Sequence, residues 1–256
     1  MELNSKQIHL WFANQAEFEQ AELEGKCLGW LSPQERERYD RYHFDHHRTE
    51  FLLGRMLIRT VLSEYEAREP ASWNFIQNDY GKPAPDPAQT SVPLYFNLSH
   101  SGERLVLAIS AHEAIGVDIE ASSRQRRVER IAQRYFSPAE LQALLALPGE
   151  QQLSRFYELW TLKEAYIKAR GMGLALSLQE FGFDLSDPES LRLWLGEGME
   201  DDSEAWQFWQ MQPGDAFQLA VAVKTAGPDR IEEISSFKRS GLSHCAALAL
   251  PLQRRS

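Results

Sequence analysis

The chain has 256 residues, of which 43% are hydrophobic and 25% are charged, and its formal net charge at pH 7 is −10. This composition is ordinary for a folded soluble protein and excludes a fibrous or disordered chain. The negative charge argues against a general nucleic-acid-binding protein, because such a protein must neutralise phosphates. The length fits one large domain or two small ones.

The N-terminal residues do not resemble a targeting segment. The stretch MELNSKQIHLWF lacks the basic end and long apolar core of a signal peptide, and no apolar run approaches the roughly 20 residues that span a bilayer. The cysteines, Cys27 and Cys245, are far apart in the sequence, and we interpret them as free thiols. We therefore expect a cytoplasmic protein with no membrane partner.

The first half of the chain predicts a helix followed by a sheet. The segment from Ser32 to Leu62 is expected to be helical, with Ser32 as the N-cap and Pro33 at the first helical position. The turn-rich stretch YGKPAPDP, residues 80–87, predicts irregular structure. The stretch LYFNLSHSGERLVLAIS then predicts two short strands around Ser101 and Gly102, and AIGVDIE predicts a third strand.

The second half repeats this order of elements. The stretch FSPAELQALLAL predicts a short helix capped by Ser137, and a longer helix is expected from about Gln152 to Arg170. Strand patterns follow in FGFDL, AWQFWQM and FQLAVAV. Beyond about Thr225 the pattern weakens, and LPLQRRS suggests a mobile end without an assigned function.

The repeated order predicts an α+β fold with two similar lobes related by a pseudo-twofold axis. Each lobe is expected to be a long helix packed on a small, mainly antiparallel sheet, with a cleft between the lobes. We divide the chain into an N-terminal lobe at residues 1–114, a C-terminal lobe at 115–228 and a C-terminal extension at 229–256. No clear sequence identity links the halves, so this division depends on element order alone.

Two carboxylates in GVDIE are candidate metal ligands. Asp118 and Glu120 are two residues apart on a predicted strand, so both side chains project from the same face. Adjacent carboxylates repel each other, and oxygen ligands favour magnesium or manganese over zinc. The alternative is a solvated strand end that carries two surface acids.

The stretch WTLKEAYIKARGMGL places an acid and a base on one face of a predicted helix. Glu164 and Lys168 are four residues apart, which also suits a surface ion pair worth about 0.3 to 0.5 kcal/mol. If this face meets the predicted strand, Glu164 could complete the metal site begun by Asp118 and Glu120. Lys168 could then hold a phosphate that shares the metal.

Polar side chains in FNLSHS form a candidate phosphate site next to a strand end. These residues are Asn97, Ser99, His100 and Ser101, and a structural role for the histidine is the alternative. The stretch HFDHHR brings His43, His46 and His47 together, but a second cluster with zinc-ligand spacing is missing. We interpret HFDHHR as a solvated helix face on which Arg48 is the candidate phosphate contact.

Taken together, these motifs resemble the large, pseudo-dimeric phosphopantetheinyl transferases of the surfactin-synthetase activator type. The resemblance runs from about Ser32 to Leu174 and comprises six pieces in the family's order: HRTEFLLGRMLIR, YGKP, FNLSHS, IGVDIE, FSPAE and WTLKEAYIKARGMGL. It implies transfer of the phosphopantetheine arm of coenzyme A to a serine of an acyl or peptidyl carrier protein. The pathway, whether fatty acid, polyketide or nonribosomal peptide synthesis, is not indicated by these motifs.

The resemblance also implies roles for individual residues. Asp118, Glu120 and Glu164 are similar to the family's magnesium ligands, Lys168 to the partner of the pyrophosphate, and Asp118, Glu164 and Lys168 to its catalytic residues. The implied coenzyme A contacts are Arg48, Thr49, Lys82, Ser99, His100 and Lys168. We expect a monomer, and the alternatives are a coenzyme A-binding module without turnover or a plain interaction protein.

Two groups of arginines need separate interpretation. The family often has lysines ahead of HRT, where this chain has Arg36, Arg38 and Arg41, and the sequence does not decide which of them binds phosphate. A basic island directly after the candidate metal strand could dock an acidic carrier protein or could be a solvated helix. Its residues are Arg124, Arg126, Arg127, Arg130 and Arg134, and Tyr135 with Phe136 is the apolar alternative for docking.

Overall fold

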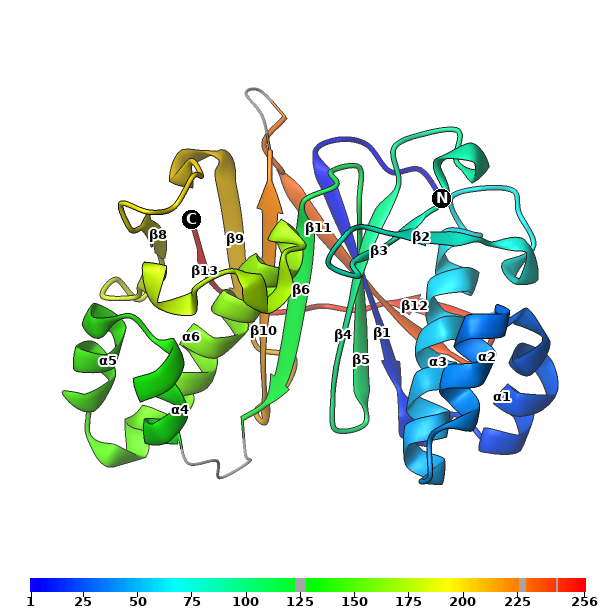
Figure 1. The fold of residues 1–256 in the computed structure, drawn as a ribbon, viewed down its shortest axis with the longest axis horizontal. Helices are drawn as coiled ribbons and strands as arrows, with labels where there is room; N and C mark the ends of the chain where they lie inside the picture. Colours follow the sequence, from blue (N-terminus) through cyan, green and yellow to red (C-terminus); the bar gives the residue numbers. More distant parts are fainter. Residues whose placement is uncertain (123–127, 226–228, 243) are drawn as a thin grey trace. The chain divides into compact units, whose positions relative to one another are not determined.

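The computed structural model describes residues 1–122, 128–225, 229–242 and 244–256. By their contacts these residues fall into two units, each assembled from two stretches of the chain. Unit 1 comprises Met1–Ala111 and Glu232–Ala249, and unit 2 comprises His112–Ile231 and Leu250–Ser256. Each unit combines helices with a sheet, which confirms the predicted α+β class (Figure 1).

The elements alternate between helical and extended segments along the chain. The helices are α1 (Gln20–Cys27), α2 (Pro33–Asp40), α3 (Asp45–Leu62), α4 (Val128–Tyr135), α5 (Pro138–Leu145) and α6 (Gly149–Arg170). The strands are β1 (Gln7–Asn14), β2 (Phe75–Gln77), β3 (Pro83–Pro85), β4 (Tyr95–Ser101), β5 (Arg104–Ser110), β6 (Ile115–Ala121), β7 (Phe181–Asp184), β8 (Arg192–Leu195), β9 (Trp206–Met211), β10 (Phe217–Lys224), β11 (Glu233–Ser240), β12 (His244–Ala247) and β13 (Leu252–Arg255). Among the described residues no helix is both long and apolar enough to cross a membrane.

Unit 1 is built on a five-stranded sheet in the order β12-β11-β1-β5-β4. All neighbouring strands are antiparallel except β1 and β11, which are parallel. The long helix α3 buries Leu52, Met56 and Leu57 in the core of this unit, as its apolar spacing requires. Figure 1 shows α1 and α2 packed beside α3.

Unit 2 is built on an antiparallel sheet in the order β13-β9-β10-β6, and α6 packs against β6 and β10. The helix approaches β6 very closely at Gly116. A Cβ atom at this position would lie 2.1 Å from the Ala165 carbonyl oxygen and 2.5 Å from the Ala169 nitrogen. Only glycine therefore permits this approach, which brings the backbone of β6 against the C-terminal half of α6.

The predicted continuous helix from Ser32 to Leu62 is wrong, because the chain forms α2 and α3 with a break at residues 41–44. Ser32 caps α2 as predicted. The helix is strongly charged, and Tyr39 is its buried residue. Three of the four residues at the break, Tyr42, His43 and Phe44, are only modest helix formers. Arg48 Nε donates to the Tyr42 carbonyl oxygen at 2.9 Å. This bond gives a partner to the Tyr42 carbonyl group, which lies between the two helices.

Two segments that were expected to lack regular structure contain strands. Within residues 80–87, β3 pairs with β2 across a turn that uses Gly81 at φ 85°, and its prolines are tolerated because a two-stranded ribbon leaves both edges open. The C-terminal segment contributes β11, which pairs with β1, and β13, which pairs with β9. The predicted mobile end is therefore wrong: its pairing partners are distant in sequence, and local pattern cannot indicate them.

Candidate active site

The candidate carboxylates of unit 2 lie on the β6 face that α6 covers. Gly116, Asp118 and Glu120 alternate along β6, so they share one face, and Gly116 fixes that face against the helix. Asp118 is buried and Glu120 is half-buried. The alternative of two solvated surface acids does not hold for Asp118, because its side chain is enclosed between strand and helix.

The helix residues of the candidate site meet these carboxylates. Lys168 Nζ lies 2.6 Å from Asp118 Oδ1 and also donates to the Val117 carbonyl oxygen at 3.3 Å. Glu164, one turn earlier on α6, interacts electrostatically with Asp118, Glu120 and Lys168. The structure therefore brings together the strand pair and the helix pair that the sequence proposed separately.

Glu164 differs chemically from an ordinary surface glutamate. Its pKa is raised to about 7, mainly by burial and further by repulsion from Asp118 and Glu120, while the positive charge of Lys168 opposes the shift. A carboxyl group with this pKa can both release and accept a proton at neutral pH. The site thus combines a proton-transfer group with a fixed cation.

In unit 1, two of the candidate coenzyme A contacts lie in the first turns of α3. The Arg48 guanidinium binds the Tyr42 carbonyl oxygen, and it lies 3.6 Å from the Asp45 carboxylate. Thr49 is buried, and its Oγ1 donates to the Asp45 carbonyl oxygen at 2.9 Å. Lys82 is half-buried just before β3.

The FNLSHS residues lie within β4 and not beyond its end, so they do not form one cluster. Strand alternation places Asn97, Ser99 and Ser101, which are all buried, on one face, and His100 on the other. His100 Nδ1 lies 3.3 Å from Glu50 Oε2 on α3. His100 is thereby linked to the helix that carries Arg48 and Thr49, whereas Ser99 faces away from that helix.

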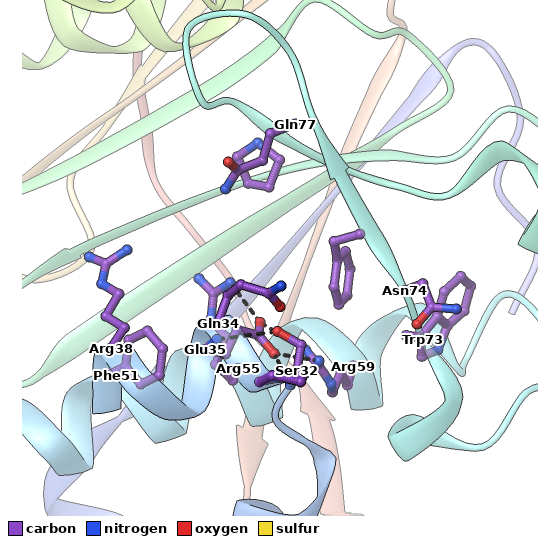
Figure 2. Close-up of a pocket in the computed structure, with 13 residues that line it drawn as sticks. Ser32, Gln34, Glu35, Arg38, Phe51, Arg55, Arg59, Trp73, Asn74 and Gln77 are labelled. Atoms are coloured by element: carbon purple, nitrogen blue, oxygen red, sulfur yellow. Dashed lines mark hydrogen bonds and ion pairs between the residues drawn. The ribbon is translucent and has the colours of Figure 1, made fainter. Parts of the chain in front are cut away.

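Unit 1 also contains a cavity of about 630 Å³ between α2, α3 and the β2–β3 ribbon (Figure 2). Figure 2 shows the Glu35 carboxylate at its base between Arg55 and Arg59, with Arg38 and Phe51 at one side. Its lining residues are Ser32, Pro33, Gln34, Glu35, Arg38, Phe51, Arg55, Arg59, Trp73, Asn74, Phe75, Gln77 and Pro83. Of these residues, only Arg38 was considered a possible phosphate ligand from the sequence. The others were missed because the cavity forms where three elements pack together, and that packing has no sequence signature.

The carboxylate at the base of this cavity is held in its charged form. Glu35 Oε2 lies 2.7 Å from Arg59 Nη2, and its Oε1 lies 3.4 Å from Arg55 Nη1. Burial by itself would raise the pKa of Glu35, but the Ser32 backbone N–H and the two arginines outweigh it, so the pKa lies below its usual value. The base of the cavity therefore carries two guanidinium groups against one carboxylate, a net positive charge, and Arg38 adds positive charge at the side.

Comparison with known proteins covers both units. Residues 114–222 match the 4'-phosphopantetheinyl transferase superfamily, and residues 10–112 match its family described as 4'-phosphopantetheinyl transferase, N-terminal. The chain is 34% identical to the 4'-phosphopantetheinyl transferase HetI of Nostoc sp., over 88% of this chain and 91% of HetI. The chain belongs to the 4'-phosphopantetheinyl transferase superfamily.

Two further relatives extend the comparison. The 4'-phosphopantetheinyl transferase Sfp of Bacillus subtilis is 34% identical, over 82% of this chain and 88% of Sfp. The human L-aminoadipate-semialdehyde dehydrogenase-phosphopantetheinyl transferase is 29% identical, over 80% of this chain and 71% of the human protein. The predicted family and the predicted enzyme class, a 4'-phosphopantetheinyl transferase, are confirmed.

The donor set of this transferase fits a hard divalent cation, although the described residues contain no group of three or more His, Cys, Asp or Glu side chains already arranged around an ion. Asp118, Glu120 and Glu164 offer only oxygen ligands, which suits magnesium. Their mutual repulsion contributes to the raised pKa of Glu164, and a divalent cation would relieve that repulsion. Lys168 supplies positive charge to Asp118.

In the sequence, the histidine-rich stretch HFDHHR and the basic island lie outside β6 and α6, which carry these carboxylates. The His46 and His47 rings lie 4.0 Å apart between centroids at the start of α3, and the described part of the chain has no metal cluster there. Three arginines of the basic island, Arg124, Arg126 and Arg127, lie outside the described residues, whereas Arg130 and Arg134 lie on α4. Phe136 is buried and stacked on Phe156, so it is not an apolar surface for docking.

Proposed function

We propose that the protein transfers the 4'-phosphopantetheine group of coenzyme A to a serine of an apo acyl or peptidyl carrier protein. The Oγ atom of the serine forms a bond to the β-phosphorus, the pyrophosphate bond breaks, and adenosine 3',5'-bisphosphate leaves. The observation that carries the proposal is the contact of Lys168 with Asp118 beside Glu164, within a chain of this transferase family. A protein that only bound coenzyme A would not require these groups together.

Glu164 and Lys168 divide the chemistry. Glu164, the half-buried carboxylate one turn before Lys168, takes the proton from the serine hydroxyl as it attacks, directly or through a water molecule. Lys168 places a positive charge where negative charge develops on the leaving phosphate. Magnesium held by Asp118, Glu120 and Glu164 would add charge neutralisation at the pyrophosphate.

Unit 1 supplies the contacts to the coenzyme A nucleotide in this proposal. Its candidate ligands are Arg48, Thr49 and His100, with Lys82 just before β3, and the family resemblance adds Ser99 from the other face of β4. The lining of the cavity in Figure 2 includes none of these five residues. Arg38 is a separate candidate, because it alone of the three arginines left open by the sequence lines that cavity, with its guanidinium 5.4 Å from the centre of the Phe51 ring. Arg36 and Arg41 instead form exposed pairs with Asp40 and Glu37 on their own helix turn.

The two-lobe, pseudo-twofold arrangement and a monomeric state are part of the same proposal. Internal similarity supports it, because each unit packs a long helix on a sheet and precedes that helix with a short one that starts with Ser-Pro. A cytoplasmic location and a carrier protein as the macromolecular partner follow from the proposed reaction. The partner's serine must reach Glu164 and Lys168 in unit 2.

The decisive experiment incubates the protein with coenzyme A, magnesium and a panel of apo carrier proteins, and measures intact mass. The expected result is a gain equal to one phosphopantetheine group on at least one carrier, and a much slower but measurable gain with Lys168→Ala. A protein whose thermal stability rises with coenzyme A but which modifies no carrier would be a binding module. Absence of both effects would leave only an interaction protein.

A further inference from the structure

A buried carboxylate outside the candidate active site gathers an unusual number of donors. Asp201 lies in the segment before β9, and its side chain is 1% exposed. Its Oδ2 accepts from Tyr166 Oη at 2.7 Å, Arg170 Nη1 at 2.6 Å and Trp206 Nε1 at 2.9 Å. Its Oδ1 accepts from Lys224 Nζ at 2.5 Å and from the Asp202 N–H at 2.9 Å.

These contacts join four separate parts of unit 2 at one point. Tyr166 and Arg170 belong to α6, Trp206 begins β9, and Lys224 ends β10. Burial alone would raise the pKa of Asp201, but hydrogen bonds from Lys224 and Tyr166 outweigh it and lower the pKa to about 2. The carboxylate therefore stays charged at neutral pH and holds the end of the helix against the sheet.

The position of Lys168 connects this cluster to the active site. Tyr166 and Arg170 are four residues apart, so they share one face of α6. Lys168 lies two residues from each, about 200° around the helix, so it projects from the opposite face. The same helical turn is thus held by Asp201 on one side and presents Lys168 to Asp118 on the other.

The end of a helix needs such support. Lys168 is only two residues before the last residue of α6, which ends at Gly171 in the left-handed conformation. The last turn of a helix frays readily, because its carbonyl groups lack partners within the helix. A side chain anchored on a fraying turn would lose the fixed geometry that electrostatic catalysis requires.

We propose that Asp201 is a positioning residue, which fixes the last turn of α6 and so keeps Lys168 in place for the transfer reaction. This inference rests on the proposed function. It predicts that Asp201 acts on turnover through Lys168, and that weakening its contacts lowers kcat more than it raises the Michaelis constant for coenzyme A. A merely structural role would instead change stability, whatever residue occupies position 168.

The test is a double-mutant cycle with a matched control. Asp201→Asn is made in the wild-type and in the Lys168→Ala background, and kcat is measured by carrier-protein modification with saturating coenzyme A. The control is Glu158→Gln, which removes a carboxylate on the same helix that is 12% exposed and pairs with Arg155 and Arg254. Urea unfolding of each variant reports the loss of stability.

We expect Asp201→Asn to lower kcat by about 10-fold in the wild-type background and by less than about 2-fold without Lys168. Glu158→Gln should leave kcat within about 2-fold of the wild type. An equal loss with and without Lys168, an equal loss in the Glu158 variant, or an unchanged kcat would each overturn the inference. If the wild type itself modified no carrier and Lys168→Ala changed nothing, the proposed function would fail instead.

Tyr166→Phe provides a milder second variant in case Asp201→Asn does not fold. It removes one donor to Asp201 and keeps the ring, which packs against Phe181 and Trp206. The expected result is a kcat lowered about 2- to 3-fold, again dependent on Lys168. A kcat equal to that of the wild type would count against the inference.

Discussion

The two units begin their paired helices with the same device and use it differently. In unit 1 Ser32 and Glu35 form a capping box with Pro33 at the first helical position, and in unit 2 Ser137 and Glu140 form another. In both units the glutamate then reaches a basic residue on the following long helix. The short helix is thus locked to the long one by a charge pair that starts from its own cap.

In unit 2 the pair is sealed inside the core. The Glu140 and Lys163 side chains are 1% and 0% exposed, and Lys163 Nζ also donates to the Leu178 and Phe181 carbonyl oxygens at 2.8 and 2.7 Å. Glu140 in turn accepts from the Phe183 N–H at 2.9 Å. Every contact is internal, so this pair fixes the scaffold behind the active-site helix.

In unit 1 the equivalent pair forms the base of the cavity. Arg59 has a second arginine, Arg55, beside it, and both pair with Glu35, whose side chain is 16% exposed. The same sequence device therefore forms a buried ion pair in unit 2 and part of a pocket wall in unit 1. What differs is whether the neighbouring segment closes over it, as Phe181 and Phe183 do in unit 2.

The largest effect should come from breaking the sealed pair. Glu140→Ala leaves Lys163 buried without its counter-charge and should cost about 3 to 5 kcal/mol of unfolding free energy. Glu35→Ala should cost less, about 1 to 3 kcal/mol, because water can enter the cavity beside Arg55 and Arg59. Urea unfolding, monitored by amide hydrogen exchange in each unit, measures the loss of stability in both variants. A larger loss for Glu35→Ala than for Glu140→Ala would contradict this contrast between the two units.

A second contrast concerns the helix–sheet contacts. Gly116→Ala forces β6 and α6 apart, because the added carbon meets backbone atoms at 2.1 and 2.5 Å. We expect a loss of about 1 to 3 kcal/mol in stability and of about 100-fold in kcat, as Asp118 separates from Lys168. Gly54→Ala in α3 is the control. Its added carbon meets two movable side-chain atoms, Leu98 Cδ2 at 3.1 Å and Leu105 Cδ2 at 3.8 Å, so stability should change by less than about 1 kcal/mol.

The pH dependence of stability should separate the two carboxyl groups, Glu164 and Glu35. The pKa of Glu164 is raised to about 7 from 4.5 in the unfolded chain, so its contribution is fully present below about pH 4.5 and is lost as the pH rises through 7. In metal-free buffer this loss amounts to at most roughly 3 kcal/mol. Glu164→Gln should reduce the fall in stability between pH 5 and 8. Glu35→Gln should leave that fall unchanged, because the pKa of Glu35 is lowered and the group stays charged over this range. A melting temperature with the same pH slope in Glu164→Gln would exclude this origin.

The smallest effect is expected at the side of the cavity. Arg38→Ala should raise the Michaelis constant for coenzyme A about 10-fold with kcat nearly unchanged, since one charged contact to phosphate contributes about 1.4 kcal/mol. Arg36→Ala, which breaks only an exposed pair with Asp40, is the matched control and should change neither constant. Equal effects of the two substitutions in steady-state kinetics would remove Arg38 from the nucleotide site.

Several features of the fold follow from local sequence, and these were predicted correctly. The caps Ser32 and Ser137 are visible in the sequence because a capping box needs only neighbouring residues. The strands around FNLSHS and IGVDIE, and the long helix that ends at Arg170, have strong patterns of their own. Asp118, Glu120, Glu164 and Lys168 were proposed from same-face spacing on those elements and from the family resemblance, and the structure brings them near one another.

The tertiary structure decided the features that depend on partners distant along the chain. The sequence by itself determined the family, the α+β class and the helix caps, and it indicated the candidate carboxylates, because these depend on motifs and local spacing. It could not indicate that β11 pairs with β1, that Glu35 meets Arg59 below a cavity, or that Asp201 holds the end of α6. Each of these contacts joins residues at least 24 positions apart. Which residues pair is decided by the free energy of packing whole elements together, and no local sequence pattern encodes that free energy.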